Sequence, residues 1–128
     1  GVLADRLAFL ETFTHKFFSD TSGKLLVSEA QRQYAQMIGA FASAKGSHDC
    51  VAAFSRTDFR PDLAKITVPT LVIHGDSDQI VPFDVSGART HKAVKGSQLH
   101  LIKNGPHGCN LSHAAQFNQA LIQFLQST

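Results

Sequence analysis

Several features that identify whole classes of protein are missing from the 128-residue sequence. No apolar run approaches the roughly eighteen residues that a membrane-spanning helix needs. The formal charge of +2 comes from interspersed Lys and Arg without a run of like charges, so no basic surface for nucleic acid or for a membrane is indicated. There is also no internal repeat and no low-complexity segment. We therefore expect neither nucleic acid nor a membrane as a partner.

Cysteine is scarce, and its scarcity indicates the cellular compartment in which the protein works. Cys50 and Cys109 are the two cysteines, they lack the spacing of metal ligands, and a structural disulfide is not expected in a reducing compartment. The start, GVLADRLAFL, carries Asp5 and Arg6 where a signal peptide would need an unbroken apolar core. With 43% hydrophobic residues the chain is suited to one ordinary domain. We expect a soluble, cytoplasmic protein.

The first part of the chain is predicted to be helical. Apolar residues at steps of three and four predict an amphipathic helix over residues 2–18. Ser28, with Gln31 three residues later, resembles a capping box that opens a second helix running to about Ala44. A shorter helix is expected over residues 48–54. Residues 1–60 thus form one predicted region, without a strand signal.

The pattern changes after Pro61, and residues 61–128 form the second predicted region. TLVI is a short apolar run of the kind expected for a buried parallel strand, and LHLI resembles the next strand. Helices are expected after each. Strand, helix, strand, helix is a βαβα unit of an α/β fold, for which a parallel sheet with a right-handed crossover is the default. The expected elements are strands at 70–73 and 99–102, a helix capped by Asp84 or Ser86 that ends near Val94, and a helix over 111–125 whose buried face carries Ala114, Phe117, Leu121 and Phe124.

The predicted sheet is incomplete. A parallel strand that is apolar on both faces needs neighbouring strands and helices on both sides, yet only two convincing strands are present. Three explanations stay open: the other strands come from another polypeptide, copies of this chain pair with one another, or the chain is a piece of something longer.

Chemically useful side chains follow both strands. Asp76 and Asp78 come directly after the first strand, and His107 lies in the NGPHG turn after the second. Sites in open parallel sheets form beyond the carboxyl ends of the strands, so these groups are expected to be neighbours. A carboxylate that accepts a hydrogen bond from one imidazole nitrogen leaves the other nitrogen free to take a proton from a hydroxyl.

The segment VPTLVIHGDSDQIVP, followed by NGPHG and an amphipathic helix, resembles the C-terminal half of an α/β-hydrolase. It is most similar to the cofactor-free haloperoxidase, arylesterase and perhydrolase group. The resemblance implies that Asp78 is the catalytic acid and His107 the catalytic base, and that Asp76 supports the turn. It also implies that residues 1–60 form a helical cap, that no metal or other cofactor takes part, and that substrates are small esters, or acids with peroxide.

One part of the family pattern is absent. No G-x-S-x-G pentapeptide, which would carry the nucleophile, occurs in the sequence, and the early H-G-type oxyanion loop is missing too. The chain would then supply only the Asp and His of the triad, would need an N-terminal hydrolase half as its partner, and would be inactive alone. The alternative is a non-catalytic half that acts as an assembly module or self-associates through its sheet edge.

Other interpretations of single residues stay open. Asp78 could only end a strand, and His74 is most simply a hydrogen-bonded structural residue. His107, Cys109 and His113 could be read as metal ligands, although their spacing is not a standard one. Cys109, near a helix N-terminus, could have a lowered thiol pKa and act as a nucleophile, but a small buried cysteine is the simpler interpretation.

Overall fold

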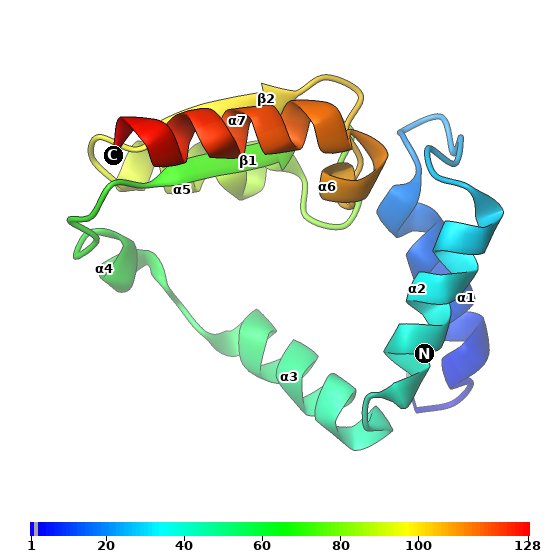
Figure 1. Cartoon of the computed structure of the whole chain (residues 1–128). Coiled ribbons are helices and arrows are strands. Elements are labelled where there is room, and N and C mark those ends of the chain that lie inside the picture. Colours follow the sequence, from blue (N-terminus) through cyan, green and yellow to red (C-terminus); the bar gives the residue numbers. More distant parts are fainter. Residues whose placement is uncertain (2) are drawn as a thin grey trace.

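The computed structural model describes residue 1 and residues 3–128; Val2, with which the first predicted helix begins, lies outside the described residues. Helices precede and follow a two-stranded sheet, as the sequence predicts (Figure 1). The elements are α1 (Arg6–Phe18), α2 (Glu29–Phe41), α3 (Ala44–Arg56), α4 (Arg60–Leu63), β1 (Leu71–Gly75), η1 (Phe83–Val85), α5 (Gly87–Ala93), β2 (Gln98–Ile102), α6 (Cys109–Ser112) and α7 (Ala114–Ser127).

Side-chain caps define where the first helices begin. The Asp5 side chain accepts a hydrogen bond from the Ala8 amide, so α1 begins four residues later than the predicted helix. The capping box of α2 is confirmed: the Gln31 amide donates to the Ser28 hydroxyl, and the Ser28 amide donates to the Gln31 side chain. In both cases a short polar side chain satisfies an amide that the helix leaves unpaired.

The predicted bounds of the next helices are wrong, because Ser43 caps a helix that the apolar pattern does not indicate. Ser43 accepts a hydrogen bond from the Gly46 amide at 3.1 Å and starts a new helix there. As a result α2 ends at Phe41, short of residue 44, and α3 runs over Ala44–Arg56 where the pattern predicted only residues 48–54. A serine between two apolar stretches is an ordinary N-cap.

The C-terminal helices also differ from expectation. Neither Asp84 nor Ser86 caps α5 through its side chain, because the Ser86 hydroxyl donates instead to the Pro82 carbonyl at 2.7 Å. The single helix predicted over 111–125 is two helices, α6 and α7, which meet at His113, where the backbone departs from helical angles (φ −122°, ψ 39°). The expected buried face of α7 is only half-buried, and Leu121 on it is exposed.

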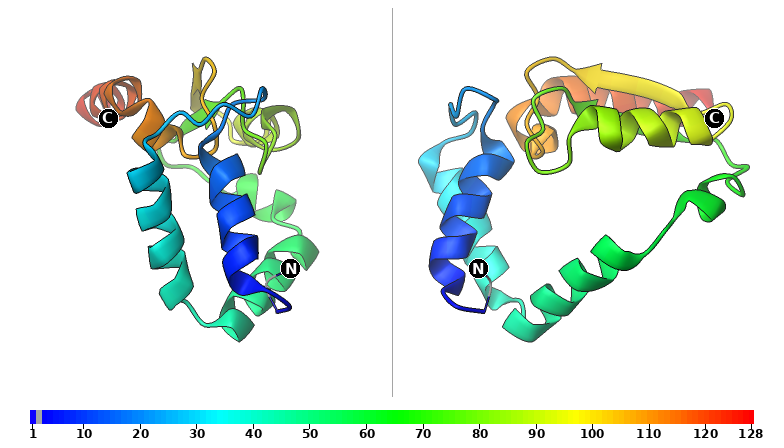
Figure 2. Two further views of the ribbon diagram at one scale, coloured as in Figure 1. Left: turned by 90° about the vertical axis from the view of Figure 1, so that its right-hand side faces the viewer. Right: turned by 180° about the vertical axis from the view of Figure 1, so that it is seen from behind.

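The sheet has the predicted parallel pairing. β1 and β2 run side by side in register from Leu71 opposite Gln98 to Gly75 opposite Ile102. Helices α5 and α7 cover opposite faces of the sheet, as the two opposed views show (Figures 1 and 2). This three-layer order confirms the α/β class, and the carboxyl ends of both strands meet at one edge.

The described residues bury little apolar surface. The strands are expected to be buried on both faces, but most of β1 is only half-buried and Leu99 and Leu101 of β2 are exposed. Large apolar side chains are exposed on the helical part as well; Phe41, for example, is 83% exposed. A two-stranded sheet leaves both outer edges without a strand partner among these residues, and this explains the exposure. The buried apolar side chains are Phe18, Val94, Ile102, Cys109 and Ala120.

The division into residues 1–60 and 61–128 stays a prediction. Helix α3 links the α1–α2 pair to the α/β part without burying any of its own residues (Figure 1). Two hydrogen bonds join the parts elsewhere: the Gly108 amide donates to the Phe17 carbonyl at 2.8 Å, and the Gln79 side chain donates to the Asp20 carbonyl. Within the described residues, no helix has both the length and the apolar character needed to cross a membrane.

Candidate active site

The turns that follow β1 and β2 are bonded to each other. The Asp76 amide donates to the Ile102 carbonyl, and the Asp76 carboxylate accepts from the Asn104 amide at 2.6 Å. Asp76 thus supports a turn, as expected, but the amide that it binds belongs to the second turn rather than its own. The backbones touch at Gly75, where an added Cβ would lie 2.1 Å from the Gly105 carbonyl oxygen. This contact sets the spacing between the two turns.

Asp78 is held by the first turn and faces the second. One carboxylate oxygen, Oδ1, accepts hydrogen bonds from the Ile80 and Val81 amides, both at 2.8 Å. The other, Oδ2, lies 2.7 Å from Nδ1 of His107. The side chain is only 3% exposed. Each oxygen of this buried carboxylate therefore has a hydrogen-bond donor.

His107 combines a fixed orientation with an accessible nitrogen. Since the Asp78 carboxylate accepts, Nδ1 carries the proton, and Nε2 has no hydrogen-bond partner among the described residues. The ring packs edge to face on Phe17 from α1, with centroids 4.6 Å apart and an interplanar angle of 73°. The side chain is 31% exposed. Nε2 is therefore available to accept a proton from a group placed against it.

This arrangement has the chemistry of the acid–base half of a hydrolytic triad. A carboxylate bonded to Nδ1 fixes the tautomer and stabilises the imidazolium that forms when Nε2 takes a proton. Asp78 and His107 follow the carboxyl ends of adjacent strands, and the sequence predicts that they are neighbours for this reason. That they are catalytic stays a prediction at this point.

The structure argues against the two other uses considered for this region. Burial raises the pKa of the Cys109 thiol, and the nearby Asp78 carboxylate adds to the rise, so the lowered pKa expected of a nucleophilic thiolate is not found. Among the described residues no group of three or more His, Cys, Asp or Glu side chains is placed to hold a metal ion, and His113 contacts the Ser112 hydroxyl instead.

Two neighbours of the pair were not predicted as part of the site. His74, at the end of β1, donates from Nε2 to the Val81 carbonyl at 2.9 Å, and the same nitrogen lies 3.3 Å from Oδ2 of Asp78. Phe17 belongs to the apolar stripe of α1 and gives no sign in the sequence that it meets a histidine. The HGDSD spacing could have indicated His74, because a strand residue four positions before Asp78 lies at the same sheet edge.

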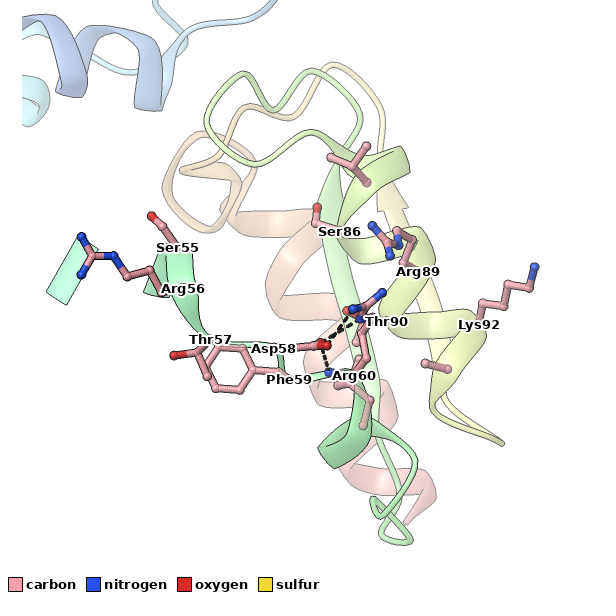
Figure 3. Close-up of a pocket in the computed structure, with 13 residues that line it drawn as sticks. Ser55, Arg56, Thr57, Asp58, Phe59, Arg60, Ser86, Arg89, Thr90 and Lys92 are labelled. Carbon is pink, nitrogen blue, oxygen red and sulfur yellow. Dashed lines mark hydrogen bonds and ion pairs between the residues drawn. The ribbon is translucent and has the colours of Figure 1, made fainter. Parts of the chain in front are cut away.

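An open cleft of about 780 Å³ lies away from the pair, between the end of α3, α4 and α5 (Figure 3). Neither Asp78 nor His107 lines it. Within it, Arg60 binds Asp58 through two nitrogens at 2.8 and 2.7 Å and, mainly by these hydrogen bonds, lowers the pKa of Asp58 to about 2. Arg89 and Lys92 add positive charge on the α5 side. The cleft is lined mostly by exposed side chains rather than by a buried constellation, so the strand-end pair is the better candidate site.

Comparison with known proteins agrees with the fold. No protein-family model matches the chain. A Synechocystis protein named "Putative non-heme chloroperoxidase" is 44% identical over 127 residues, which are 98% of this chain and 46% of that protein. The bifunctional esterase/perhydrolase of Acinetobacter calcoaceticus is 40% identical over 89 residues, 70% of this chain and 32% of that protein.

A solved structure shows the shared architecture. The crystal structure of a bromoperoxidase from Bacillus anthracis superposes with a TM-score of 0.95 at 56% identity, covering 98% of this chain and 46% of that one. The chain thus spans about half the length of the curated relatives that it matches over its full extent, and the match is to their C-terminal part. The chain belongs to the α/β-hydrolase superfamily, and within it to the group of non-heme haloperoxidases and esterases.

Proposed function

We propose that this chain supplies the acid and the base of a serine-hydrolase-type acyl-transfer centre, with His107 as general base and acid and Asp78 as the residue that orients it. The observation that carries the proposal is the 2.7 Å contact between Asp78 Oδ2 and His107 Nδ1, beside an Nε2 that has no hydrogen-bond partner in the part of the chain that the structure describes. The names of the relatives, which include an esterase/perhydrolase, support the choice of reaction.

In the proposed mechanism His107 takes up one proton and then donates one proton in each half-reaction. Nε2 takes the proton of a seryl hydroxyl as that oxygen attacks the ester carbonyl, and then returns it to the departing alcohol. In the second half, Nε2 takes a proton from water and returns it to the seryl oxygen as the acid is released. With hydrogen peroxide in place of water the product would be a peracid, which can oxidise halide without a metal or haem. Asp78 stays ionised throughout and stabilises the imidazolium.

The nucleophile and the oxyanion donors must come from elsewhere, because the sequence contains no G-x-S-x-G. Members of a triad act as a unit, so the acid and base alone should give little acyl transfer. We therefore expect activity only when this chain is joined to the N-terminal part of a hydrolase of this group.

The second candidate function is that of an assembly module. Its support is the two-stranded sheet, whose outer edges have no partner among the described residues, together with exposed apolar side chains such as Phe41 and Phe54. Such edges and faces favour association with a complementary chain or with a second copy of this one. Sedimentation of the purified chain tests this: a stable monomer at micromolar concentration would contradict self-association.

We also propose that the protein works in the cytoplasm. Both cysteines, Cys50 and Cys109, are free thiols, as a reducing compartment would keep them. Fractionation of cells that express the protein, followed by blotting, tests the assignment; recovery from the medium or from an oxidising compartment would contradict it.

The catalytic proposal is tested with a chimera, in which the N-terminal part of the Synechocystis relative that this chain does not match is followed by these 128 residues. Hydrolysis of p-nitrophenyl acetate is measured for the chimera and for its His107→Ala and His48→Ala variants. His48 lies exposed on α3 and serves as the matched control. We expect activity that His107→Ala lowers by at least about a thousandfold and that His48→Ala leaves unchanged. If the His107→Ala chimera retains full esterase activity, the assignment is wrong.

A further inference from the structure

His74 lies against Asp78, close to the same carboxylate oxygen that binds His107. It ends β1, its side chain is 13% exposed, and Nε2 lies 2.9 Å from the Val81 carbonyl oxygen and 3.3 Å from Oδ2 of Asp78. A carbonyl can only accept a hydrogen bond, so Nε2 carries the proton. The Asp78 oxygen that binds His107 also lies 3.3 Å from this nitrogen, near the positive end of its N–H group.

We propose that His74 is a positioning residue for the acid–base pair: its Nε2–H group holds the turn that carries Asp78 and balances the charge of the carboxylate oxygen that binds His107. The effect of His74 on catalysis rests on the proposed function. The structural part of the proposal concerns the Asp78–His107 contact alone.

The geometry of the turn explains why one donor has this influence. Val81 is bonded through both of its backbone groups: its amide donates to Asp78 Oδ1 at 2.8 Å, and its carbonyl accepts from His74. The Ser86 hydroxyl lies 3.4 Å from that carbonyl oxygen, but it donates its one proton to the nearer Pro82 carbonyl at 2.7 Å. Without the imidazole, Val81 loses this bond to β1, and one of the two amides that hold Asp78 Oδ1 is less firmly placed.

A second residue makes room for the His74 ring. A Cβ on Gly87, the first residue of α5, would lie 2.6 Å from His74 Nδ1 and 3.2 Å from a ring carbon of Phe83. Phe83 also packs against His74, with ring centroids 5.5 Å apart. Only glycine leaves the imidazole where it is. Gly87→Ala therefore displaces His74 from the side opposite its donor, without changing the donor itself.

The structural part is tested on the 128-residue chain labelled with ¹⁵N-histidine. The observed signal is the low-field proton on His107 Nδ1, which the bond to Asp78 protects from exchange with water. We expect His74→Phe, a ring without the donor, and Gly87→Ala to weaken or broaden this signal. His74→Gln, whose amide can replace Nε2–H, should retain it. His91→Gln is the matched control, because His91 contacts Ser97 and neither member of the pair.

The amide spectrum of each variant reports whether it is folded. If His74→Phe does not fold, the positioning role is tested by comparing the His107 signal of Gly87→Ala with that of His74→Gln. An unchanged His107 signal in a folded His74→Phe or Gly87→Ala variant would overturn the proposal. Loss of the signal in His74→Gln as severe as that in His74→Phe would also overturn it, because the donor would then not be the operative group.

The catalytic consequence is tested in the chimera. His74→Phe should lower kcat by about tenfold, while KM changes little. This is the factor expected for the loss of one hydrogen bond beside a charged group, here the Asp78 carboxylate. His74→Gln should restore most of the loss. If the chimera has no esterase activity but the His107 signal responds as expected, the proposed function fails and the positioning role stands. If the chimera is instead active and depends on His107, while His74→Phe changes neither kcat nor the His107 signal, the positioning role is wrong and the proposed function stands.

Discussion

The ring of Phe17 meets the ring of His107 edge to face, with centroids 4.6 Å apart. The first helix of the chain thus contacts the histidine that follows the last strand, and the Gly108 amide next to that histidine donates to the Phe17 carbonyl. An edge-to-face contact limits how an imidazole can tilt. The helical region therefore contributes to the orientation of His107.

Replacing Phe17 by Ala should destabilise the chain and free the His107 ring. Loss of a half-buried ring and its aromatic contacts should lower the free energy of unfolding by about 2 kcal/mol. Urea unfolding measures the loss, and carbethoxylation of His107 by diethylpyrocarbonate, read by mass spectrometry, measures the accessibility of its ring. We expect faster modification in the variant.

Phe41→Ala is the control for this experiment, because Phe41 is exposed on α2 and far from His107 in the chain. Its effect on unfolding of the isolated chain should stay within about 0.5 kcal/mol. Equal losses from the two substitutions would show that Phe17 has no special contact in solution.

Gly75→Ala should be among the most destabilising single methyl additions in the chain. The new Cβ would lie 2.1 Å from the Gly105 carbonyl oxygen, a backbone atom that cannot rotate away. We expect a loss of about 3 kcal/mol in the free energy of unfolding, together with loss of the His107 Nδ1 signal, because the two turns are forced apart. Gly46→Ala, where the new Cβ on α3 makes an ordinary 3.4 Å contact with the N-cap residue Ser43, should instead stabilise by up to about 1 kcal/mol. A neutral Gly75→Ala substitution would mean that the turns are not in contact.

Cys109 should react slowly with thiol reagents. Burial raises its pKa, so at a given pH a smaller fraction is thiolate than in the unfolded chain, and the thiolate is the reacting form. Cys50 is exposed. In alkylation with iodoacetamide near pH 8, followed by peptide mapping, we expect Cys50 to be labelled first and Cys109 to reach the same rate only in urea. Fast labelling of Cys109 in the folded chain would revive its interpretation as a nucleophile.

Asp58 should keep its charge in moderately acidic solution. The hydrogen bonds from Arg60 lower its pKa from 3.8 to about 2, so the carboxylate stays ionised as the pH falls through the usual range of an aspartate. In Arg60→Gln this pKa should rise toward 3.8, as read by NMR titration of the side-chain carboxyl carbon. Arg56→Gln, in the same cleft but without a contact to Asp58 among the described hydrogen bonds and ion pairs, is the control. An Asp58 pKa that does not respond to Arg60→Gln would show that the pair does not persist in solution.

Much of this architecture follows from the sequence, because it depends on local patterns. The TLVI and LHLI runs predict two parallel strands, and Ser28 with Gln31 predicts the start of α2. The approach of Asp78 and His107 could be expected because both follow strands whose carboxyl ends meet at one edge. In each case the information lies within a few residues or in a general rule of topology.

What the sequence did not indicate depends on contacts between distant segments or on competing local bonds. The Phe17–His107 contact and the packing of Gly87 against His74 exist only in the folded chain. The cap expected from Ser86 failed because its hydroxyl binds the Pro82 carbonyl instead. The half-buried state of β1 follows from the number of strands present, which no pattern within TLVI records.

The central claim is that this chain contributes the base and its orienting acid, but not the nucleophile, to an acyl-transfer centre. Acid quenching of the chimera during turnover of p-nitrophenyl acetate, followed by peptide mapping by mass spectrometry, locates the acetyl group. The account predicts one acetyl group on the serine of G-x-S-x-G in the N-terminal part, none on these 128 residues, and no acetyl-enzyme in His107→Ala. An acetyl group on Cys109 of the present chain, or an acetyl-enzyme that forms equally fast without His107, would contradict it.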